Sequence, residues 1–194
     1  MSHPFRQTRN TVWGRTEMHT RYVIALVGDD RPGLVEKLSS VVAEHGGSWS
    51  ESRMSVLAGQ FAGVALVRVD PNQAAALERD LKELAGDRLQ LSLRRADSTP
   101  REVRPHHAVC LELTGHDRPG LVHEITRVLR DRDVNIDDLV TERMSGAMSG
   151  GALFRAVAEL QVPNDLPLEQ LREDIEALAN ELMVDIHVRE LVDE

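Results

Sequence analysis

The tetrapeptide Asp-Arg-Pro-Gly occurs twice in this chain, at residues 30–33 and again at residues 117–120. Each copy follows a short apolar run that ends in a glycine, Gly28 or Gly115, and each is followed by Leu-Val. Behind each copy, apolar residues recur at the same offsets: Leu34, Val35, Leu38, Val41 and Val42 in the first, and Leu121, Val122, Ile125, Val128 and Leu129 in the second. A recurrence that keeps the phase of a strand, a turn and a helix indicates a tandem duplication.

The pattern of each repeat predicts a strand, a helix, two strands, a second helix and a fourth strand. In the first repeat, Gly46-Gly47 ends the first helix, because glycine tolerates a left-handed backbone at a helix C-terminus. Apolar runs and their periods predict strands at 22–27, 48–55, 61–69 and 89–93, and helices at 33–45 and around Leu77, Leu81 and Leu84. The second repeat predicts strands at 109–115, 135–144, 152–162 and 184–188, and helices from 121 and around 168–182.

A βαββαβ unit of this length is the ferredoxin-like topology, a four-stranded antiparallel sheet with both helices on one face. We therefore predict an α+β chain of two ferredoxin-like domains in tandem. The expected boundaries are a flexible N-terminal extension over 1–21, a first domain over 22–96, a polar linker with two prolines over 97–107, and a second domain over 108–194. Two such sheets can pack side by side through their edges.

Composition narrows the classes of function. The chain has 194 residues, of which 41% are hydrophobic, enough for two small cores. A net charge of −9 without a long basic run disfavours direct binding to nucleic acid. No apolar run is long enough to cross a membrane, and no secretion signal is recognisable. The single cysteine, Cys110, cannot form an internal disulfide, so we expect a cytoplasmic protein.

The first 21 residues differ from the rest, with four arginines, one acidic residue, and the aromatic residues Phe5 and Trp13. One interpretation is a basic arm that contacts a partner. The other, which we favour, is a flexible extension ahead of the first strand, with an alternative start at Met18.

The repeated turn has a physical role at the start of a helix. We expect Asp30 and Asp117 to cap the free amides behind them, and Pro32 and Pro119 to suit the first helical turn, where no N–H is needed. Gly33 and Gly120, which follow the prolines, have no side chain at the point where a small ligand could approach the backbone. Open amides and the positive end of a helix favour a carboxylate. The alternative is that this is simply a good helix start with no ligand.

The turn and its surroundings resemble the ACT domain. The resemblance rests on a strand that ends in Gly-x-Asp-Arg-Pro-Gly-Leu-Val, a helix, and then Gly-Gly-Ser-Trp at 46–49 or Val-Asn-Ile at 134–136. It covers about 22–95 and 108–190. ACT domains are small βαββαβ modules that bind amino acids and regulate a partner domain or protein.

The resemblance implies a ligand site at each turn, completed by a polar residue that begins the second strand of a neighbouring domain. The implied ligand-binding residues are Asp30, Arg31, Pro32, Gly33 and Leu34 with Ser48, and Asp117, Arg118, Pro119, Gly120 and Leu121 with Asn135. Ser48 departs from the asparagine common at its position, so the two sites need not be equivalent.

A pair of such domains without a catalytic domain most resembles the family of glycine cleavage system transcriptional repressors. That resemblance implies a non-enzymatic regulator that senses a small amino acid, glycine first, and acts on a DNA-binding activator protein instead of on DNA. It implies no cofactor, and we expect a homo-oligomer. The alternative is a ligand-free scaffold for protein interaction or dimerisation, which amino-acid-induced stabilisation would distinguish from a sensor.

Other signals are weaker. His116 and His123 flank the second turn, but their spacing does not predict a metal site, although His116 could make ligand binding depend on pH. The Gly-rich loop 145–151 joins two strands and lacks the helix and lysine of a phosphate-binding loop. RNA-recognition modules share the βαββαβ order, but the predicted central strands offer only Phe61 and Phe154 for stacking, in an acidic chain.

Overall fold

A computed structural model describes residues 19–86, 88–96, 105–145 and 151–191. The chain divides into two compact units, residues 1–100 and 101–194, called domain 1 and domain 2 here. The predicted extension over 1–21 lies outside the described residues as far as residue 18, and the described part of the chain enters its first strand at Thr20. Most of the predicted linker, residues 97–104, also lies outside them.

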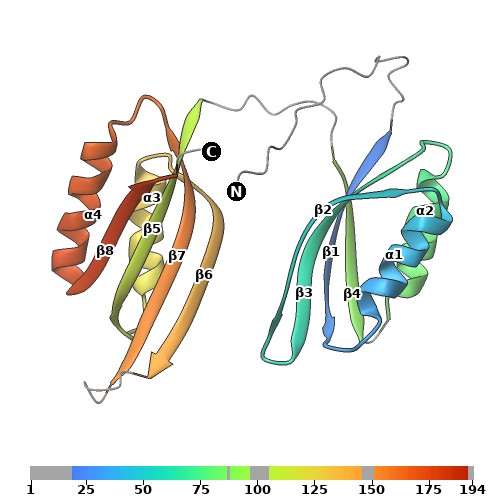
Figure 1. Ribbon diagram of the computed structural model, residues 1–194, viewed down its shortest axis with the longest axis horizontal. Helices are drawn as coiled ribbons and strands as arrows, with labels where there is room; N and C mark the ends of the chain where they lie inside the picture. The colour runs from blue at the N-terminus through green and yellow to red at the C-terminus, as the bar shows by residue number, and fades with distance from the viewer. Residues whose placement is uncertain (1–18, 87, 97–104, 146–150, 192–194) are drawn as a thin grey trace, which may run out of the picture. The chain divides into compact units, whose positions relative to one another are not determined.

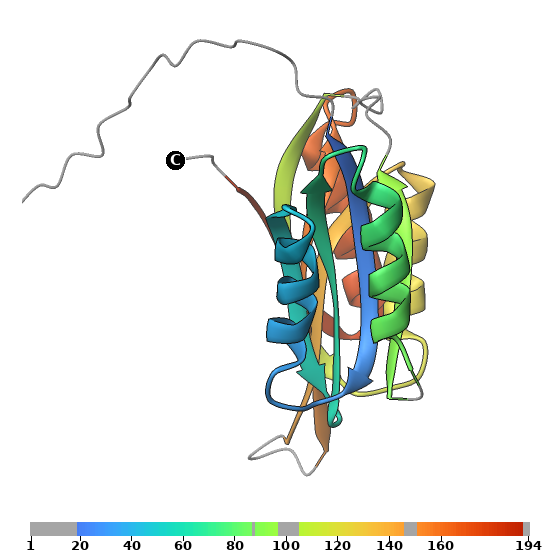
Figure 2. The ribbon, with the colours of Figure 1, turned by 90° about the vertical axis from the view of Figure 1, so that its right-hand side faces the viewer.

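Domain 1 is a four-stranded antiparallel sheet with two helices on one face (Figures 1 and 2). Its elements are β1 (Thr20–Asp29), α1 (Leu34–Glu44), β2 (Ser48–Leu57), β3 (Gln60–Val69), α2 (Ala74–Leu84) and β4 (Leu89–Ala96). The strand order is β2-β3-β1-β4, with β1 paired to β3 on one side and to β4 on the other. The prediction of a ferredoxin-like βαββαβ unit is confirmed.

Domain 2 repeats this architecture. Its elements are β5 (His106–His116), α3 (Leu121–Asp131), β6 (Asn135–Ser145), β7 (Ala152–Pro163), α4 (Leu168–Leu182) and β8 (Val184–Glu190). The strand order β6-β7-β5-β8 reproduces the order of domain 1 strand for strand. The prediction of two such domains in tandem is therefore confirmed as well.

The core of each domain lies between its sheet and its helices. Along β1, burial alternates, so Tyr22, Ile24 and Leu26 face the helices while the residues between them face away. Leu38 on α1 and Leu77 on α2 meet this face and are almost fully buried. In domain 2 the same packing joins β5 and β7 to Ile125 and Leu129 of α3 and to Leu171 and Ile175 of α4. The period-two and period-3.6 patterns of the sequence thus meet in one apolar layer per domain.

A polar contact joins the two helices of each domain at equivalent positions. In domain 1, Nε2 of His45, just after α1, lies 2.7 Å from Oδ2 of Asp80 on α2. In domain 2, Arg132 occupies the position of His45, and its Nε lies 2.7 Å from Oδ2 of Asp174 on α4. That buried oxygen has no aligned hydrogen bond among the described residues, so the contact with Arg132 is mainly ionic.

The helix ends differ in part from expectation. The N-cap residues are Gly33 and Gly120, and neither helix has a capping hydrogen bond from a side chain. The prediction that Asp30 and Asp117 cap the helices is therefore wrong, because each lies three residues ahead of the N-cap and a capping side chain must come from the N-cap itself. Likewise, Pro32 and Pro119 precede the N-cap instead of lying in the first helical turn. The predicted glycine ending of α1 is confirmed, since Gly46 has φ +64°.

Candidate functional site

The turn that follows the first strand of each domain has the same backbone in both copies. Gly33 has φ +88° and Gly120 has φ +94°, a left-handed conformation that glycine adopts without steric cost. The first helical hydrogen bonds run from the Lys37 amide to the Gly33 carbonyl and from the Glu124 amide to the Gly120 carbonyl, both 3.0 Å long. The amides ahead of them have no partner within the helix. Each turn therefore presents open N–H groups at the positive end of a helix.

A backbone hydrogen bond ties each turn to the neighbouring hairpin. In domain 1, the Asp30 amide donates to the Gly59 carbonyl over 3.1 Å, at the two-residue tip between β2 and β3. In domain 2, the Asp117 amide donates to the carbonyl of Ala152, the first residue of β7, over 2.9 Å. The Gly-rich loop between β6 and β7 falls largely on residues 146–150, outside the described residues.

The carboxylate of Asp30 is open in domain 1. Asp30 is exposed, and the described residues place no hydrogen bond or ion pair on its side chain. Its neighbour Arg31 contacts Asp29 instead, with 3.2 Å from Nη2 to Oδ2, and Gln60 donates to the other oxygen of Asp29. Lys37, in the first turn of α1, adds a positive charge near the helix start. The turn of domain 1 thus combines open amides, a lysine and an unpaired carboxylate.

The equivalent carboxylate of Asp117 is paired in domain 2. Nε of Arg143 on β6 lies 2.7 Å from Oδ2 of Asp117. Arg118 forms a two-pronged contact with Glu124 on α3, with 2.7 Å from Nη2 to Oε2. Oε1 of Glu124 also lies 3.8 Å from where a Cβ on Gly120 would be, so a carboxylate of the protein itself lies beside the helix start. These contacts pair the charged side chains around the turn of domain 2, whereas the carboxylate of Asp30 in domain 1 is unpaired among the described residues.

Comparison of the repeats could have found the residues that make this difference. Lys37 and Glu124 hold equivalent positions with opposite charges, and Val56 is replaced by Arg143. The sequence prediction missed all of them, because it considered only the turn itself. A position-by-position alignment of the two repeats carries the signal.

Ser48 and Asn135 lie far from the turns of their own domains. Ser48 pairs with Arg68, whose other neighbour on β1 is Arg21, whereas the turn follows Asp29 at the opposite end of β1. Eight residues of strand separate the two ends, a distance of about 27 Å. Asn135 likewise pairs with Gln161 at the far end of its sheet and donates to Asp137 over 3.1 Å. The structure therefore brings residues 30–34 together, and residues 117–121 together, without the residue that begins the second strand.

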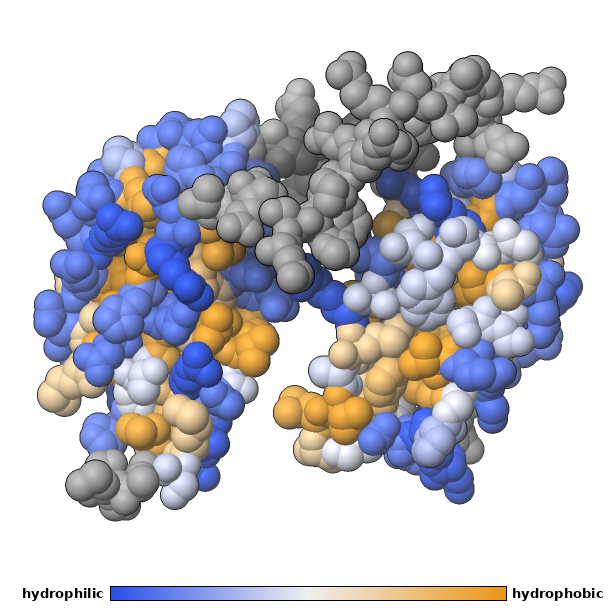
Figure 3. Space-filling model, viewed as in Figure 1, coloured by the Kyte–Doolittle hydropathy of each residue, from blue (hydrophilic) through white to orange (hydrophobic). Residues whose placement is uncertain are grey.

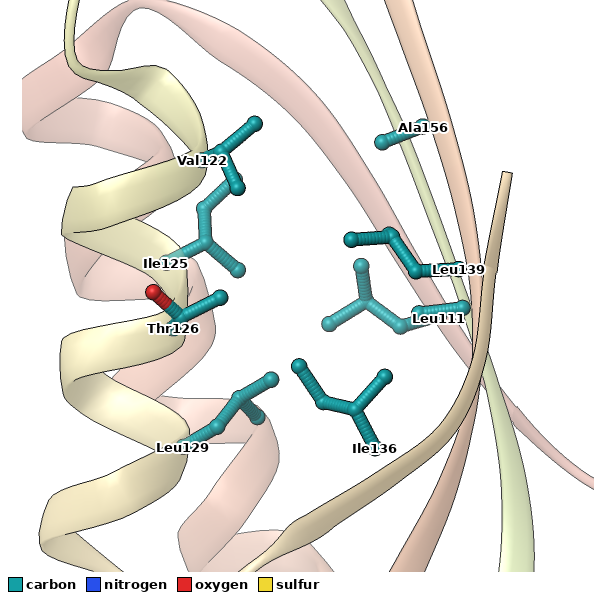
Figure 4. Close-up of a pocket in the computed structure, with 9 residues that line it drawn as sticks. Leu111, Val122, Ile125, Thr126, Leu129, Ile136, Leu139 and Ala156 are labelled. Carbon is teal, nitrogen blue, oxygen red and sulfur yellow. The ribbon is translucent and has the colours of Figure 1, made fainter. Parts of the chain in front are cut away.

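A small cavity under α3 does not provide an alternative site. Its volume is about 20 Å³, and it lies between α3 and the strands β5, β6 and β7 (Figure 4). Its lining is Leu111, Val122, Ile125, Thr126, Leu129, Ile136, Leu139, Ala156 and Ala158. A space of that size holds about one water molecule and, with almost no polar lining, offers that water few partners. It is a packing defect of the core.

Metal and membrane sites find no support in the described ranges. In residues 19–86, 88–96, 105–145 and 151–191, no group of three His, Cys, Asp or Glu side chains is placed to hold a metal ion. No helix in this part of the chain has the length and apolarity needed to cross a membrane. His116 is exposed at the end of β5, and His123 is exposed on α3.

The model of the ACT domain matches residues 20–94 and again residues 107–189. The chain belongs to the ACT-domain family. The matched segments coincide with the two sheets and include both turns, so the resemblance inferred from the turns is confirmed.

Relatives match this tandem chain over most of its length. It is 25% identical to the glycine cleavage system transcriptional repressor of Escherichia coli (strain K12), over 82% of this chain and 84% of the relative. The crystal structure of an unknown protein from Galdieria sulphuraria superposes with a TM-score of 0.75 and 29% identity, over 90% of this chain and 99% of that one.

A second solved structure, provisionally named a glycine cleavage system transcriptional repressor, has a TM-score of 0.68 at 22% identity and covers 91% of this chain and 99% of its own. At that identity it supports the fold alone. The ACT family and the curated relative together support a regulatory ACT protein.

Proposed function

We propose that this protein is an amino-acid-responsive regulator that acts through a protein partner. The relative from Escherichia coli is named a transcriptional repressor, and the net charge of −9 disfavours a direct contact with DNA phosphates. A DNA-binding activator protein is therefore the proposed target, and the cytoplasm the proposed compartment. The relative is named as a regulator and not as an enzyme, which supports a function without catalysis.

The open turn of domain 1 is the observation that carries the proposal. A free amino acid has a carboxylate and an ammonium group about one carbon apart. The unpaired amides that start α1 suit the carboxylate, and the unpaired side chain of Asp30 suits the ammonium group. Gly33 has no atom within 4 Å of where a Cβ would lie, so a small ligand has space there. Glycine is the first candidate because the turn offers charged contacts to a small ligand and because the relative from Escherichia coli is named for the glycine cleavage system.

Domain 1 is the proposed primary site, and domain 2 the weaker one. In domain 2, a ligand ammonium group would have to displace Arg143 from Asp117, and a ligand carboxylate would meet Glu124 beside Gly120. In domain 1, the equivalents of these residues are Val56 and Lys37, of which one is neutral and the other attracts a carboxylate. Ser48 and Asn135 remain proposed contacts from a neighbouring domain, since neither reaches the turn of its own sheet.

Binding would change the affinity for the partner by the same factor by which the partner changes the affinity for the amino acid. Such couplings are typically about 1–3 kcal/mol. Thermal unfolding of the purified chain with each of the twenty amino acids tests the binding step. A ligand present at about 100 times its Kd stabilises the native state by about 2.7 kcal/mol, which a melting curve resolves.

Two matched variants locate the site. We expect Asp30→Asn to abolish stabilisation by glycine and Asp117→Asn to leave most of it. A panel in which no amino acid shifts the melting temperature would instead favour the ligand-free scaffold. A shift that Asp117→Asn removes and Asp30→Asn does not would place the site in domain 2.

A further inference from the structure

The two sheets differ on the face that the helices leave open. In domain 1, the centre of this face consists of six apolar side chains: Val23, Ala25 and Val27 on β1, and Ala62, Val64 and Leu66 on β3. Val23 is 37% exposed, Val27 38% and Val64 45%. Figure 3 shows hydrophobic surface on both domains, including the part of domain 1 where β2 and β3 meet. Apolar surface of this extent on a sheet favours burial against another surface.

Domain 2 has no such strip among its described residues. The six equivalent positions are Cys110, Glu112, Thr114, Arg155, Val157 and Glu159. Arg189 lies 3.0 Å from Glu112, and Arg155 lies 3.1 Å from Glu142, so charged groups on this face satisfy one another. Water-exposed ion pairs of this kind leave little to gain from a dry contact. Val140 on β6 is 59% exposed beside Val157, but charged side chains occupy the central strands of this face, so the difference between the faces assigns the docking role to domain 1.

The charges around the apolar strip follow the strand register. One row across the sheet reads Glu51 on β2, Leu66 on β3, Val23 on β1 and Arg94 on β4. An acid lies at one edge, a base at the other, and two apolar residues lie between them. Glu51 and Arg94 are both exposed. A two-fold rotation about an axis along the strands, between β3 and β1, would bring Glu51 of one copy opposite Arg94 of the other.

We propose that the open face of domain 1 docks against the same face of a second copy, forming a two-fold symmetric dimer. The rotation that pairs Glu51 with Arg94 also lays Leu66 over Val23, so that charge and apolar complementarity agree. It sets Arg53 of the next row opposite Ser92, which is neutral. Arg68 and Arg21 would oppose each other at one end of the face, where long side chains can turn toward water.

The size of the face sets the strength of this dimer. Four strands about 4.8 Å apart and about eight residues long cover about 500 Å² on each copy. The total of about 1,000 Å² lies at the lower end of the range for specific interfaces. We therefore expect a reversible dimer whose population rises with protein concentration. This contact does not depend on the proposed amino-acid site, so either proposal can fail without the other.

A charge exchange tests the proposed pairing directly. Sedimentation of the full chain should show a monomer–dimer equilibrium. Glu51→Arg puts two arginines opposite each other at both ends of the row, and Arg94→Glu does the same with two glutamates. Each variant alone should therefore dimerise at least about tenfold more weakly. An equimolar mixture of the two should recover the dimer, because every contact between the unlike copies is then again an acid with a base.

A matched pair of apolar positions provides the control. Val64 and Val157 lie at equivalent places on the two open faces, so Val64→Glu should abolish the dimer and Val157→Glu should leave it unchanged. Circular dichroism and thermal unfolding verify that each variant is folded. A wild-type chain that stays monomeric at all concentrations overturns the proposal. So does a mixture of the charge variants that stays monomeric, or a Val157→Glu chain that dissociates as readily as Val64→Glu.

Discussion

Domain 1 and domain 2 keep one backbone around the Asp-Arg-Pro-Gly turn and surround it with different side chains. Gly33 and Gly120 have almost the same left-handed φ, and both turns donate an amide to the adjacent hairpin. Yet Asp30 is open, whereas Asp117 is paired with Arg143. The duplication has thus preserved a backbone geometry while the charges beside it diverged. Two sites with the same motif need not bind the same ligand with the same affinity.

The contact between the two helices of each domain likewise keeps its position while the side chain that makes it differs. His45 and Arg132 hold one position, and each reaches an aspartate on the second helix over 2.7 Å. In domain 2 the arginine is charged at every physiological pH. In domain 1 the equivalent group is an imidazole. The position of the contact is conserved between the halves, whereas the chemistry of the group that reaches the aspartate is not.

The largest expected difference concerns the glycine that precedes the last residue of the first strand in each domain. A Cβ on Gly28 would lie 2.5 Å from the carbonyl oxygen of Arg88, which is backbone and cannot move aside cheaply. A Cβ on Gly115 would instead meet the side chain of Val184. We expect Gly28→Ala to lower the free energy of unfolding of domain 1 by about 1–3 kcal/mol. Gly115→Ala should lower the free energy of unfolding of domain 2 by less, and Val184→Ala should restore part of that loss.

Native-state hydrogen exchange, read by peptide, gives the free energy of each domain separately within the intact chain. Leu89 has the side chain nearest to Gly28, so Leu89→Ala is the matched second substitution. The interpretation fails if Leu89→Ala restores the stability lost in Gly28→Ala as fully as Val184→Ala restores the stability lost in Gly115→Ala.

Gly33→Ala and Gly120→Ala should have equal effects. Neither site has an atom within 3.4 Å of the new Cβ, so only the left-handed backbone opposes the change. We expect each domain to lose about 1–2 kcal/mol of stability. The measurement is the same exchange experiment. Gly33→Asn, which tolerates this conformation better, should cost less than Gly33→Ala, and unequal losses in the two domains would show that the turns differ in more than side chains.

Introducing the residues of domain 1 at two positions of domain 2 should leave the carboxylate of Asp117 unpaired. Arg143→Val with Glu124→Lys introduces the residues of domain 1 at both positions. Loss of the exposed pair of Asp117 with Arg143 and of the pair of Arg118 with Glu124 should cost at most about 1 kcal/mol each. Protection of domain 2 by glycine should rise toward that of domain 1. If ligand protection stays confined to domain 1, these two residues do not set the difference between the sites.

The smallest effect concerns pH. Hydrogen bonds from Arg79 and then from His45 hold the pKa of Asp80 below its ordinary value. The ionised carboxylate therefore stabilises domain 1 above its unfolded pKa of about 3.9, and this contribution is lost as the pH falls through the lower folded value. Asp80→Asn should weaken domain 1 near neutral pH and converge with the wild type in acid. His45→Arg, which keeps a partner for Asp80, should retain this dependence of stability on pH. If the stability of Asp80→Asn, plotted against pH, ran parallel to that of the wild type, this account would be contradicted.

Sequence patterns predicted the fold but not the environment of the site. The repeat, the alternation along β1 and the glycine ending of α1 are local signals, and each corresponds to an observed element. The pairing of Asp117 with Arg143 is not local, because it requires the register of β6 on β7 and of β7 on β5. The predicted caps were wrong because the turn has three residues between aspartate and helix, which places glycine, not aspartate, at the N-cap.

The open face of domain 1 was partly readable from sequence. Apolar residues at both phases of β1 and β3 indicate strands with little polar surface on either side. The sequence could not show that Glu51 and Arg94 lie in one row across the sheet, because a bulge between Trp49 and Glu51 shifts the register of β2. One residue of shift exchanges the two faces of a strand. Only the three-dimensional pairing puts that acid on the same face as Val23 and Arg94.

The hydrogen bond from the Asp30 amide to the Gly59 carbonyl couples the turn after β1 to the tip of the β2–β3 hairpin. A molecule that pulls on the backbone at residue 30 must either break this bond or swing the tip with it. Leu57, which is 77% exposed, stands immediately before the tip at the edge of the open face. A displacement of the backbone at the end of β1 would therefore reach the rim of the sheet through a single backbone hydrogen bond.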